Sequence, residues 1–325
     1  MARSSAHVAL CSIALLLLLP AALSATFTMT NNCGYTVWPG LLSGAGTAPL
    51  STTGFALAHG ASASVDAPAS WSGRMWARTL CATDPTTGKF ACGTGSLQCN
   101  GGGAAPPATL AEFTLDGSGG MDFFDVSLVD GYNLPMLIVP QVAAGGVAGI
   151  NSNGSAGAGK CMATGCLVDL NGACPADLRV TMPASTTAGG TGGSGAVACR
   201  SACEAFNTPQ YCCSGAYGSP STCKPSTYSQ FFKTACPRAY SYAYDDSTST
   251  FTCTAGTTYA ITFCPSTTSG KYSGENPQAA GVQQTSNGSM TYLGGEQLAT
   301  GAASVTARAS LLVLSLAAAF AVALL

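Results

Sequence analysis

The sequence is poor in charge and in histidine, and each shortage argues against a class of function. Only 8% of the 325 residues are charged, with 12 Lys or Arg against 14 Asp or Glu, and histidine occurs twice. A net charge of −2 provides no basic surface for nucleic acid. Ser-His-Asp catalysis and histidine-ligated metal sites would both depend on His59, because His7 lies in the amino-terminal leader described below. We therefore expect no nucleic-acid partner, no metal site and no cofactor.

Cysteine, in contrast, is abundant, and its number indicates the compartment. The sequence contains 16 cysteines, of which Cys11 lies in the same leader. In an oxidising compartment this density of cysteine predicts a framework of disulfide bonds. Without Cys11 fifteen remain, and an odd number requires at least one thiol that has no partner in its own chain.

The two ends of the chain have the composition of targeting segments. Arg3, an apolar run over 8–19 and the small residues around Ser24 predict a secretory signal peptide over 1–24. At the other end, 309–325 is apolar and uncharged, which predicts the hydrophobic part of a GPI-attachment signal. We expect a secreted protein at the cell wall or outer plasma membrane that touches the membrane only through this lipid anchor. Vacuolar sorting and a plain tail are the alternatives.

A segment rich in Gly, Ser and Thr precedes the apolar carboxyl terminus. Residues 266–308 lack a periodic apolar pattern and predict a flexible stalk. The residue that receives the lipid stays open, since Asn287-Gly288-Ser289 and Gly301-Ala302-Ala303 are both small enough. Asn153 and Asn287 each begin a sequon for N-linked glycosylation, so the secreted protein is expected to be a glycoprotein, and which of the two sites is used stays open.

The part of the chain between these segments has the pattern of a β-sandwich. Alternating apolar segments punctuated by Gly, Pro, Asn and Ser predict short antiparallel strands. The expected strands are 26–37 (a hairpin broken at Asn31-Asn32), 55–65, 74–80, 109–115, 122–129, 136–139, 250–254 and 258–263. Between Cys161 and Cys236 cysteines become dense and strands disappear, and the expected helices there are 198–206 and 227–234. We assign a sandwich core to 25–80, 108–165 and 237–265, a small loop lobe to 81–107 and a disulfide-rich lobe to 166–236.

Several motifs give the chain a family resemblance. The runs from Asn31 to Pro39 (NNCGYTVWP), from Asp122 to Pro135 (DFFDVSLVDGYNLP) and from Thr258 to Pro265 (TYAITFCP) resemble segments of thaumatin-like proteins in the same order. The chain thus resembles the pathogenesis-related thaumatin family of plants, in a GPI-anchored subtype. The resemblance implies a mainly β fold over 25–265, a thaumatin-type antiparallel β-sandwich with two small disulfide-rich lobes. It also implies a monomeric defence protein.

The same resemblance implies the disulfide pairing, which spacing alone cannot give. The implied pairs are Cys33–Cys264, Cys81–Cys92, Cys161–Cys253, Cys166–Cys236, Cys174–Cys199, Cys203–Cys212 and Cys213–Cys223. The departure from the family lies between Cys92 and Cys99, where a further cysteine is usual. We therefore predict that Cys99 is unpaired. A deletion or a mistaken gene model would explain this, and so would a regulatory or dimerising thiol.

A hairpin between 109 and 129 is predicted to bring acidic residues together. If Ser118 and Gly119 form its loop, Glu112 lies opposite Asp125, and the apolar residues of both strands share the other face. Like charges directly opposite one another require compensation, for which Arg74 is the candidate.

Five residues match the acidic cleft of the family and form the candidate binding site. They are Arg74, Glu112, Asp125, Asp130 and Asp245, with Asp246 as the alternative for the last position. The resemblance links this cleft with antifungal action and with binding of β-1,3-glucan. We expect Tyr132, Tyr228 and Tyr242 to add stacking surface for sugar rings.

The same carboxyls raise the question of catalysis. Glycoside hydrolysis requires one carboxylic acid and one carboxylate. Glu112 is the candidate acid, because the negative charge of a neighbouring Asp125 carboxylate would keep Glu112 protonated. Asp130 or Asp125 would then activate water. Some family members are credited with weak endo-β-1,3-glucanase activity and many show none. We expect binding of β-1,3-glucan or another wall glycan without turnover. Weak glucanase activity and a non-catalytic cell-surface recognition or structural wall role are the alternatives.

Overall fold

The computed structural model describes residues 25–84, 86–87, 89–92, 96–141, 161–181 and 195–265, and the backbone of 282–284 and 290–292. The predicted signal peptide, the apolar carboxyl terminus, the alternative lipid-attachment sites and both sequons lie outside these residues. No helix in these ranges is both long enough and apolar enough to span a membrane.

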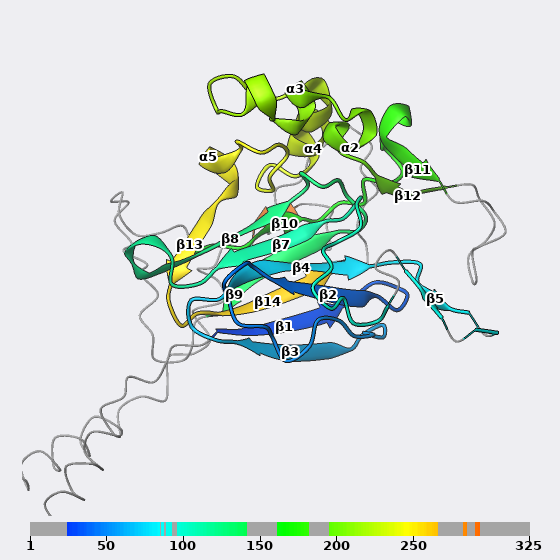
Figure 1. Ribbon diagram of the computed structural model, residues 1–325, viewed down its shortest axis with the longest axis vertical. Coiled ribbons are helices and arrows are strands. Elements are labelled where there is room, and N and C mark those ends of the chain that lie inside the picture. Colours follow the sequence, from blue (N-terminus) through cyan, green and yellow to red (C-terminus); the bar gives the residue numbers. More distant parts are fainter. Residues whose placement is uncertain are drawn as a thin grey trace, which may run out of the picture.

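Two five-stranded sheets lie face to face and form the sandwich (Figure 1). The first has the order β10 (Thr164–Cys166), β9 (Met136–Gln141), β14 (Thr258–Phe263), β1 (Ala25–Asn31) and β3 (Ser62–Ala67). The second has the order β13 (Phe251–Thr254), β8 (Met121–Ser127), β7 (Leu110–Thr114), β4 (Ser72–Arg78) and β2 (Trp38–Ser43). Strands β1 and β14 run parallel, whereas the other neighbouring strands of these two sheets are antiparallel.

Aromatic rings from both sheets meet in the core. The ring of Phe27 lies 4.6 Å from that of Phe113, and Tyr259 lies 5.1 Å from both Phe113 and Phe124. Along β1 and β14 the side chains alternate between buried and partly exposed, as expected for strands with one face on a core. The sandwich is therefore held by apolar burial between sheets.

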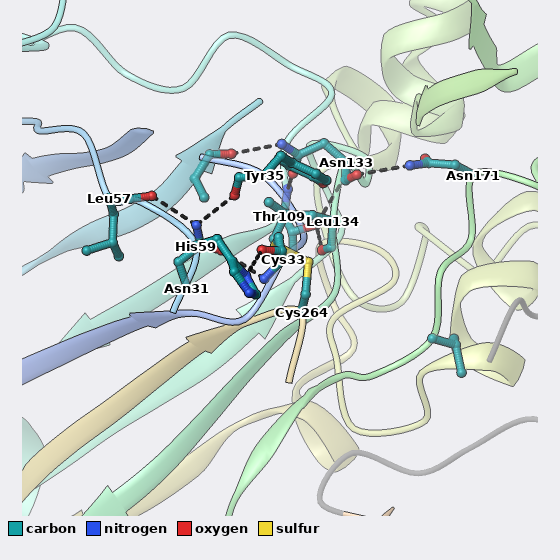
Figure 2. The surroundings of a disulfide bond; sticks show 12 residues. Asn31, Cys33, Tyr35, Leu57, His59, Thr109, Asn133, Leu134, Asn171 and Cys264 are labelled. Atoms are coloured by element: carbon teal, nitrogen blue, oxygen red, sulfur yellow. Dashed lines mark hydrogen bonds between the residues drawn. A yellow bond between two sulfur atoms is a disulfide. The ribbon is translucent and has the colours of Figure 1, made fainter. Parts of the chain in front are cut away.

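The predicted hairpin over 26–37 is wrong, because β1 and β2 belong to different sheets. The chain leaves the first sheet at Asn31, whose side-chain amide donates to the carbonyls of Tyr35 and Leu57 at 2.8 and 2.9 Å. Figure 2 shows this turn beside the Cys33–Cys264 disulfide, which ties the end of β1 to the end of β14. Satisfying the buried amide within the turn lets the chain cross between sheets instead of folding back on itself.

The two smaller parts are stapled to the sandwich. A hairpin of β5 (Ala82–Thr83) and β6 (Phe90–Ala91) projects from one side, and the helices gather beyond the sheet that contains β7 and β8 (Figure 1). The helices are α2 (Ala202–Phe206), α3 (Pro209–Cys212), α4 (Thr227–Ala235) and α5 (Asp246–Ser249), with 3₁₀ turns at Ser118–Gly120, Ala176–Leu178 and Gly215–Tyr217.

Three expectations for these parts need correction. Strands do not disappear after Cys161, since β10 extends the first sheet and β11 (Arg179–Thr181) pairs with β12 (Ala196–Cys199). The helix expected at 198–206 begins only at Ala202, because its first residues complete β12 and Ser201 then caps α2. The strands β15 (Val282–Gln284) and β16 (Met290–Tyr292) pair inside the predicted stalk.

The helix expected at 227–234 is confirmed as α4, which Ser226 and Ser229 cap reciprocally. The structure also joins the same seven cysteine pairs that the family resemblance implies. Cys99 is the free cysteine among the described residues, and it is buried.

Candidate functional site

A row of charged side chains crosses three neighbouring strands of the second sheet. Arg74 on β4 lies opposite Glu112 on β7, and Glu112 lies opposite Asp125 on β8. The register is the one predicted from the sequence, with Phe113 opposite Phe124 on the buried face. The loop differs from the prediction, since a 3₁₀ turn over Ser118–Gly120 replaces a two-residue loop.

Arg74 connects the row to the turn that follows β8. Its Nε lies 3.8 Å from Glu112 Oε1 and its Nη1 lies 3.9 Å from Asp130 Oδ2, with all three side chains partly exposed. Gly131 has a φ of 82°, and an added Cβ there would lie 2.7 Å from the carbonyl oxygen of Cys199. This glycine lets the turn redirect Asp130 toward Arg74, as the sequence suggested.

A second segment faces this row and completes a hollow. The hollow has a volume of about 390 Å³, and Tyr240, Ala243 and Asp246 line it together with the charged row. Tyr240 donates a hydrogen bond of 2.8 Å from its hydroxyl to Asp246 Oδ1. We call Arg74, Glu112 and Asp125 the strand wall, Tyr240, Ala243 and Asp246 the loop wall, and the space that they line with Asp130 the acidic groove. The acidic residues of the two walls, together with Asp130, therefore all line the hollow.

A second hollow of about 370 Å³ adjoins the first and shares the strand wall with it. Its remaining lining is uncharged and includes Ser43, Ser72, Thr114 and Phe123. Both volumes fall in the range of about 300–1,000 Å³ that is usual for small-ligand sites. From here on the acidic groove includes this second hollow, so it has a charged part and a neutral part that meet at Glu112 and Asp125.

The structure does not place Asp245 in the groove, which corrects the first choice for that position. Asp245 is 8% exposed, and its Oδ2 lies 2.9 Å from Lys233 Nζ. The same oxygen accepts hydrogen bonds from the backbone amide and the hydroxyl of Ser241. Its exposed neighbour Asp246 lines the groove instead. Asp245 is buried because it pairs with Lys233, and Asp246 is left to line the groove. The sequence does not show which of these two adjacent aspartates forms the ion pair.

Burial and charge raise the pKa of both carboxyls of the strand wall. Burial raises the pKa of Asp125 well above its ordinary value, and the carboxylates of Glu112 and Asp246 raise it further. Burial also raises the pKa of Glu112, while Arg74 lowers it and Asp130 raises it. Both carboxyls therefore hold a proton to higher pH than an exposed carboxyl does, so the predicted acid role is open to Asp125 as well as to Glu112.

Comparison with known proteins identifies the family of this chain. The model of the thaumatin family matches residues 31–265. The chain belongs to the thaumatin family. It is 54% identical over 253 residues to "Thaumatin-like protein 1" of Arabidopsis thaliana, covering 74% of this chain and 86% of that protein. It is 53% identical over 248 residues to "Pathogenesis-related protein 5" of the same plant, covering 75% and 92%.

A third relative has a name that describes an activity. The thaumatin-family chain is 50% identical over 247 residues to a protein of Prunus avium named "Glucan endo-1,3-beta-glucosidase", covering 74% of this chain and 91% of that protein. These relatives make the chain a plant-type thaumatin-like, pathogenesis-related protein.

Sequence reasoning missed Glu204, an acidic residue that does not line the hollows of this thaumatin-family site but interacts electrostatically with Asp130. Glu204 lies on α2, and the backbone bridge between Tyr132 and Cys199 brings the start of that helix beside the Asp130 turn. Burial and the Asp130 carboxylate raise the pKa of Glu204 to about 7, against the opposing effect of Arg200. The spacing of Ser201 and Glu204 is typical of a helix start and predicts where α2 begins. It does not predict that the start of α2 packs beside the Asp130 turn.

The predicted aromatic stacking residues do not line the acidic groove. Tyr132 is fully buried and its hydroxyl donates to the Val168 carbonyl at 2.9 Å, so it offers no sugar-binding surface. Tyr228 packs against Phe206, and Tyr242 lines a different hollow. Phe123, on the solvent side of β8 two residues before Asp125, and Tyr240 of the loop wall are the aromatic residues that line the two hollows from their open sides.

The acids do not have the arrangement of a metal site. In the parts of the chain that the structure describes, no group of three or more His, Cys, Asp or Glu side chains is placed to hold a metal ion. The groups that line the two hollows are carboxyls, one guanidinium, hydroxyls and the rings of Phe123 and Tyr240.

Proposed function

We propose that this chain is a secreted, antifungal defence protein that binds β-1,3-glucan of cell walls in the acidic groove. The observation that carries the proposal is the row of Arg74, Glu112 and Asp125 on the exposed face of three strands, flanked by two adjoining hollows. Sugar hydroxyls both donate and accept hydrogen bonds. A groove that offers carboxylates, a protonated carboxyl and hydroxyls can satisfy both roles along a chain of sugars.

Slow endo-β-1,3-glucanase activity is the second candidate, and two observations favour it. One relative is named for that activity. In addition, Asp125 and Glu112 are adjacent carboxyls with raised pKa values, and Asp130 lies on the other side of Arg74. In this version Asp125 or Glu112 protonates the leaving oxygen, and a carboxylate, with Asp130 as the candidate, activates water. Binding without turnover remains the first proposal.

Retention on insoluble β-1,3-glucan tests the proposal directly. The purified protein is mixed with the glucan, and bound protein and released reducing sugar are both measured. We expect retention to fall about tenfold or more in Asp125→Ala, which removes a groove carboxyl. Asp66→Ala, in β3 of the other sheet, is the matched control. Undiminished retention of Asp125→Ala would exclude the groove, and sugar release from the wild type would establish hydrolysis.

The location of the protein is a separate part of the proposal. Seven disulfides require an oxidising compartment, which supports secretion. We propose that the carboxyl-terminal signal adds a lipid anchor that holds the domain at the outer plasma membrane. Phosphatidylinositol-specific phospholipase should then release it from intact cells. Release together with the absence of glucan retention would favour the cell-surface recognition or structural wall role.

A further inference from the structure

The acidic groove carries more carboxyl groups than its own cation can balance. Among the described residues that line the two hollows, Arg74 is the only cation. The carboxyls that line them are Glu112, Asp125, Asp130 and Asp246, and the Asp130 carboxylate also acts electrostatically on Glu204 of α2. Clustered carboxyls of this kind repel one another unless a ligand or protons compensate them.

The nearby cations are engaged elsewhere. Lys233 lies 2.9 Å from Asp245, behind the loop wall. The Arg238 guanidinium lies over the ring of Phe251 at 4.5 Å. Arg200 donates to the carbonyl of Asp177 at 3.4 Å and acts on Glu204. None of these groups lines the hollows, so the negative charge is open to a ligand.

One oxygen of Asp125 gives an independent indication of a ligand. Asp125 Oδ1 is shielded from solvent and has no hydrogen-bond partner among the described residues, although the side chain lines both hollows. A buried oxygen without a donor is costly. A protonated amine supplies up to three N–H donors and also offsets negative charge, which a sugar hydroxyl does not do.

The second hollow limits what kind of amine fits. Its lining beyond the strand wall is neutral, with the hydroxyls of Ser43, Ser72 and Thr114 and the ring of Phe123. Hydroxyls and an aromatic face suit uncharged parts of a sugar ring. A linear polyamine would leave this hollow unused, whereas a glycan chain would fill both parts.

We propose that the acidic groove prefers a glycan whose rings carry protonated amines, such as a chain of glucosamine units, over an uncharged glycan of equal length. The amines lie against Asp125, Asp130 and Asp246, and the neutral ring faces lie on the second hollow. This inference rests on the proposed function, because it assigns the substrate class of the same groove.

Three hexamers test the preference on the wild-type protein: glucosamine, N-acetylglucosamine and β-1,3-linked glucose. The first two share length and linkage and differ in charge. We expect the glucosamine hexamer to bind about tenfold more tightly than its acetylated form at about 0.01 M salt, and this advantage to vanish near 1 M salt. The variants Asp130→Asn and Asp246→Asn should each reduce the advantage several-fold, and Asp66→Asn should not.

The outcomes separate this inference from the proposed function. Equal affinity for glucosamine and N-acetylglucosamine hexamers overturns the amine preference, while glucan binding lost in Asp125→Ala would still uphold the proposed function. Glucosamine binding without glucan binding upholds the groove as an amine site and overturns the glucan proposal. If none of the three hexamers binds, both are wrong.

A calorimetric measurement provides a second readout that needs no variant. At about pH 5 the amines are already protonated before binding, so a bound ammonium that lowers the pKa of the Asp125 and Glu112 carboxyls should cause a net release of protons. The apparent binding enthalpy of the glucosamine hexamer should therefore change with the ionisation enthalpy of the buffer, and that of the neutral hexamers should not. An enthalpy that is independent of buffer would overturn the placement of the amine beside these carboxyls.

Discussion

The two walls of the acidic groove are held in place by different forces. The strand wall is part of a continuous hydrogen-bonded sheet, and its strands bury Phe113 and Phe124 on the opposite face. The loop wall has only a short backbone connection to β8, in which the Tyr240 amide donates to the Val126 carbonyl and the Tyr240 carbonyl accepts from the Leu128 amide. Beyond that connection it depends on the ion pair of Lys233 with Asp245, and on the capped helix α4 that carries the lysine.

This difference teaches where the site is robust and where it is sensitive. In the strand wall, side-chain positions follow from strand register, so a change in one polar residue leaves the others in place. In the loop wall, beyond the Tyr240 connection, the partly buried ion pair of Lys233 with Asp245 holds the chain, so a single polar substitution there should disturb several groove residues. The following predictions test this contrast, from the largest expected effect to the smallest.

Truncating the core beneath the strand wall should have the largest effect on stability. Phe113 is 3% exposed and contacts the rings of Phe27 and Tyr259. We expect Phe113→Ala to lower the free energy of unfolding by about 3–5 kcal/mol, because it leaves a cavity between the sheets. Chemical denaturation measures the loss. Tyr217→Ala, at an exposed ring of the disulfide-rich lobe, is the control and should change stability by less than about 0.5 kcal/mol. Similar losses in the two variants would contradict the contrast.

Breaking the ion pair behind the loop wall should have the next largest effect. Asp245→Ala leaves the partly buried Lys233 ammonium without its carboxylate, which we expect to cost about 3 kcal/mol. Denaturation gives the stability, and glucan retention reports on the groove. The control is the adjacent Asp246→Ala, an exposed residue whose loss should affect retention but cost less than about 1 kcal/mol of stability. If the two variants exchanged these effects, the assignment of the aspartates would be reversed.

Removing the cap of α4 should have a smaller effect on the same wall. Ser226 Oγ accepts a hydrogen bond from the Ser229 amide at 3.1 Å. We expect Ser226→Ala to cost about 1 kcal/mol and to speed hydrogen exchange of α4 while the sandwich strands stay protected. Thr227→Ala, one position further and exposed, should be neutral. Equal loss of protection in β7 and β8 would show that the two regions unfold together.

The smallest expected effect concerns the pH dependence of stability. Folding raises the pKa of Asp125, so the folded state binds more protons than the unfolded state above the ordinary carboxyl value. Stability contributed by this proton is complete at lower pH and is lost as pH rises through the raised pKa. We expect Asp125→Asn to flatten this decline, measured as melting temperature against pH. Glu204→Gln should remove a further part of the decline that ends near about pH 7. A decline that stays as steep in both variants would contradict the assignment.

The sequence by itself determined the strand wall. Glycines at the turn and apolar residues on one face of each strand fix the register of Glu112 with Asp125, since a slip of one residue would bury both carboxyls. Glu112 and Asp125 lie in the two strands of one hairpin, so the pattern of that hairpin alone suffices for this pair, and Arg74 was expected as its counter-charge. The family resemblance extended this to the disulfide pairing, which no spacing could provide, and to the thaumatin type of the sandwich that the strand pattern already indicated.

Only the tertiary structure decided the rest of the groove. The crossing of the chain between sheets after Asn31, the inward turn of Asp245, the burial of Tyr132 and the approach of Glu204 each depend on a partner far away in the sequence. The physical reason is the same in each case. A polar group that leaves water must find its hydrogen-bond or charge partner, and the location of that partner is fixed only when distant elements pack together.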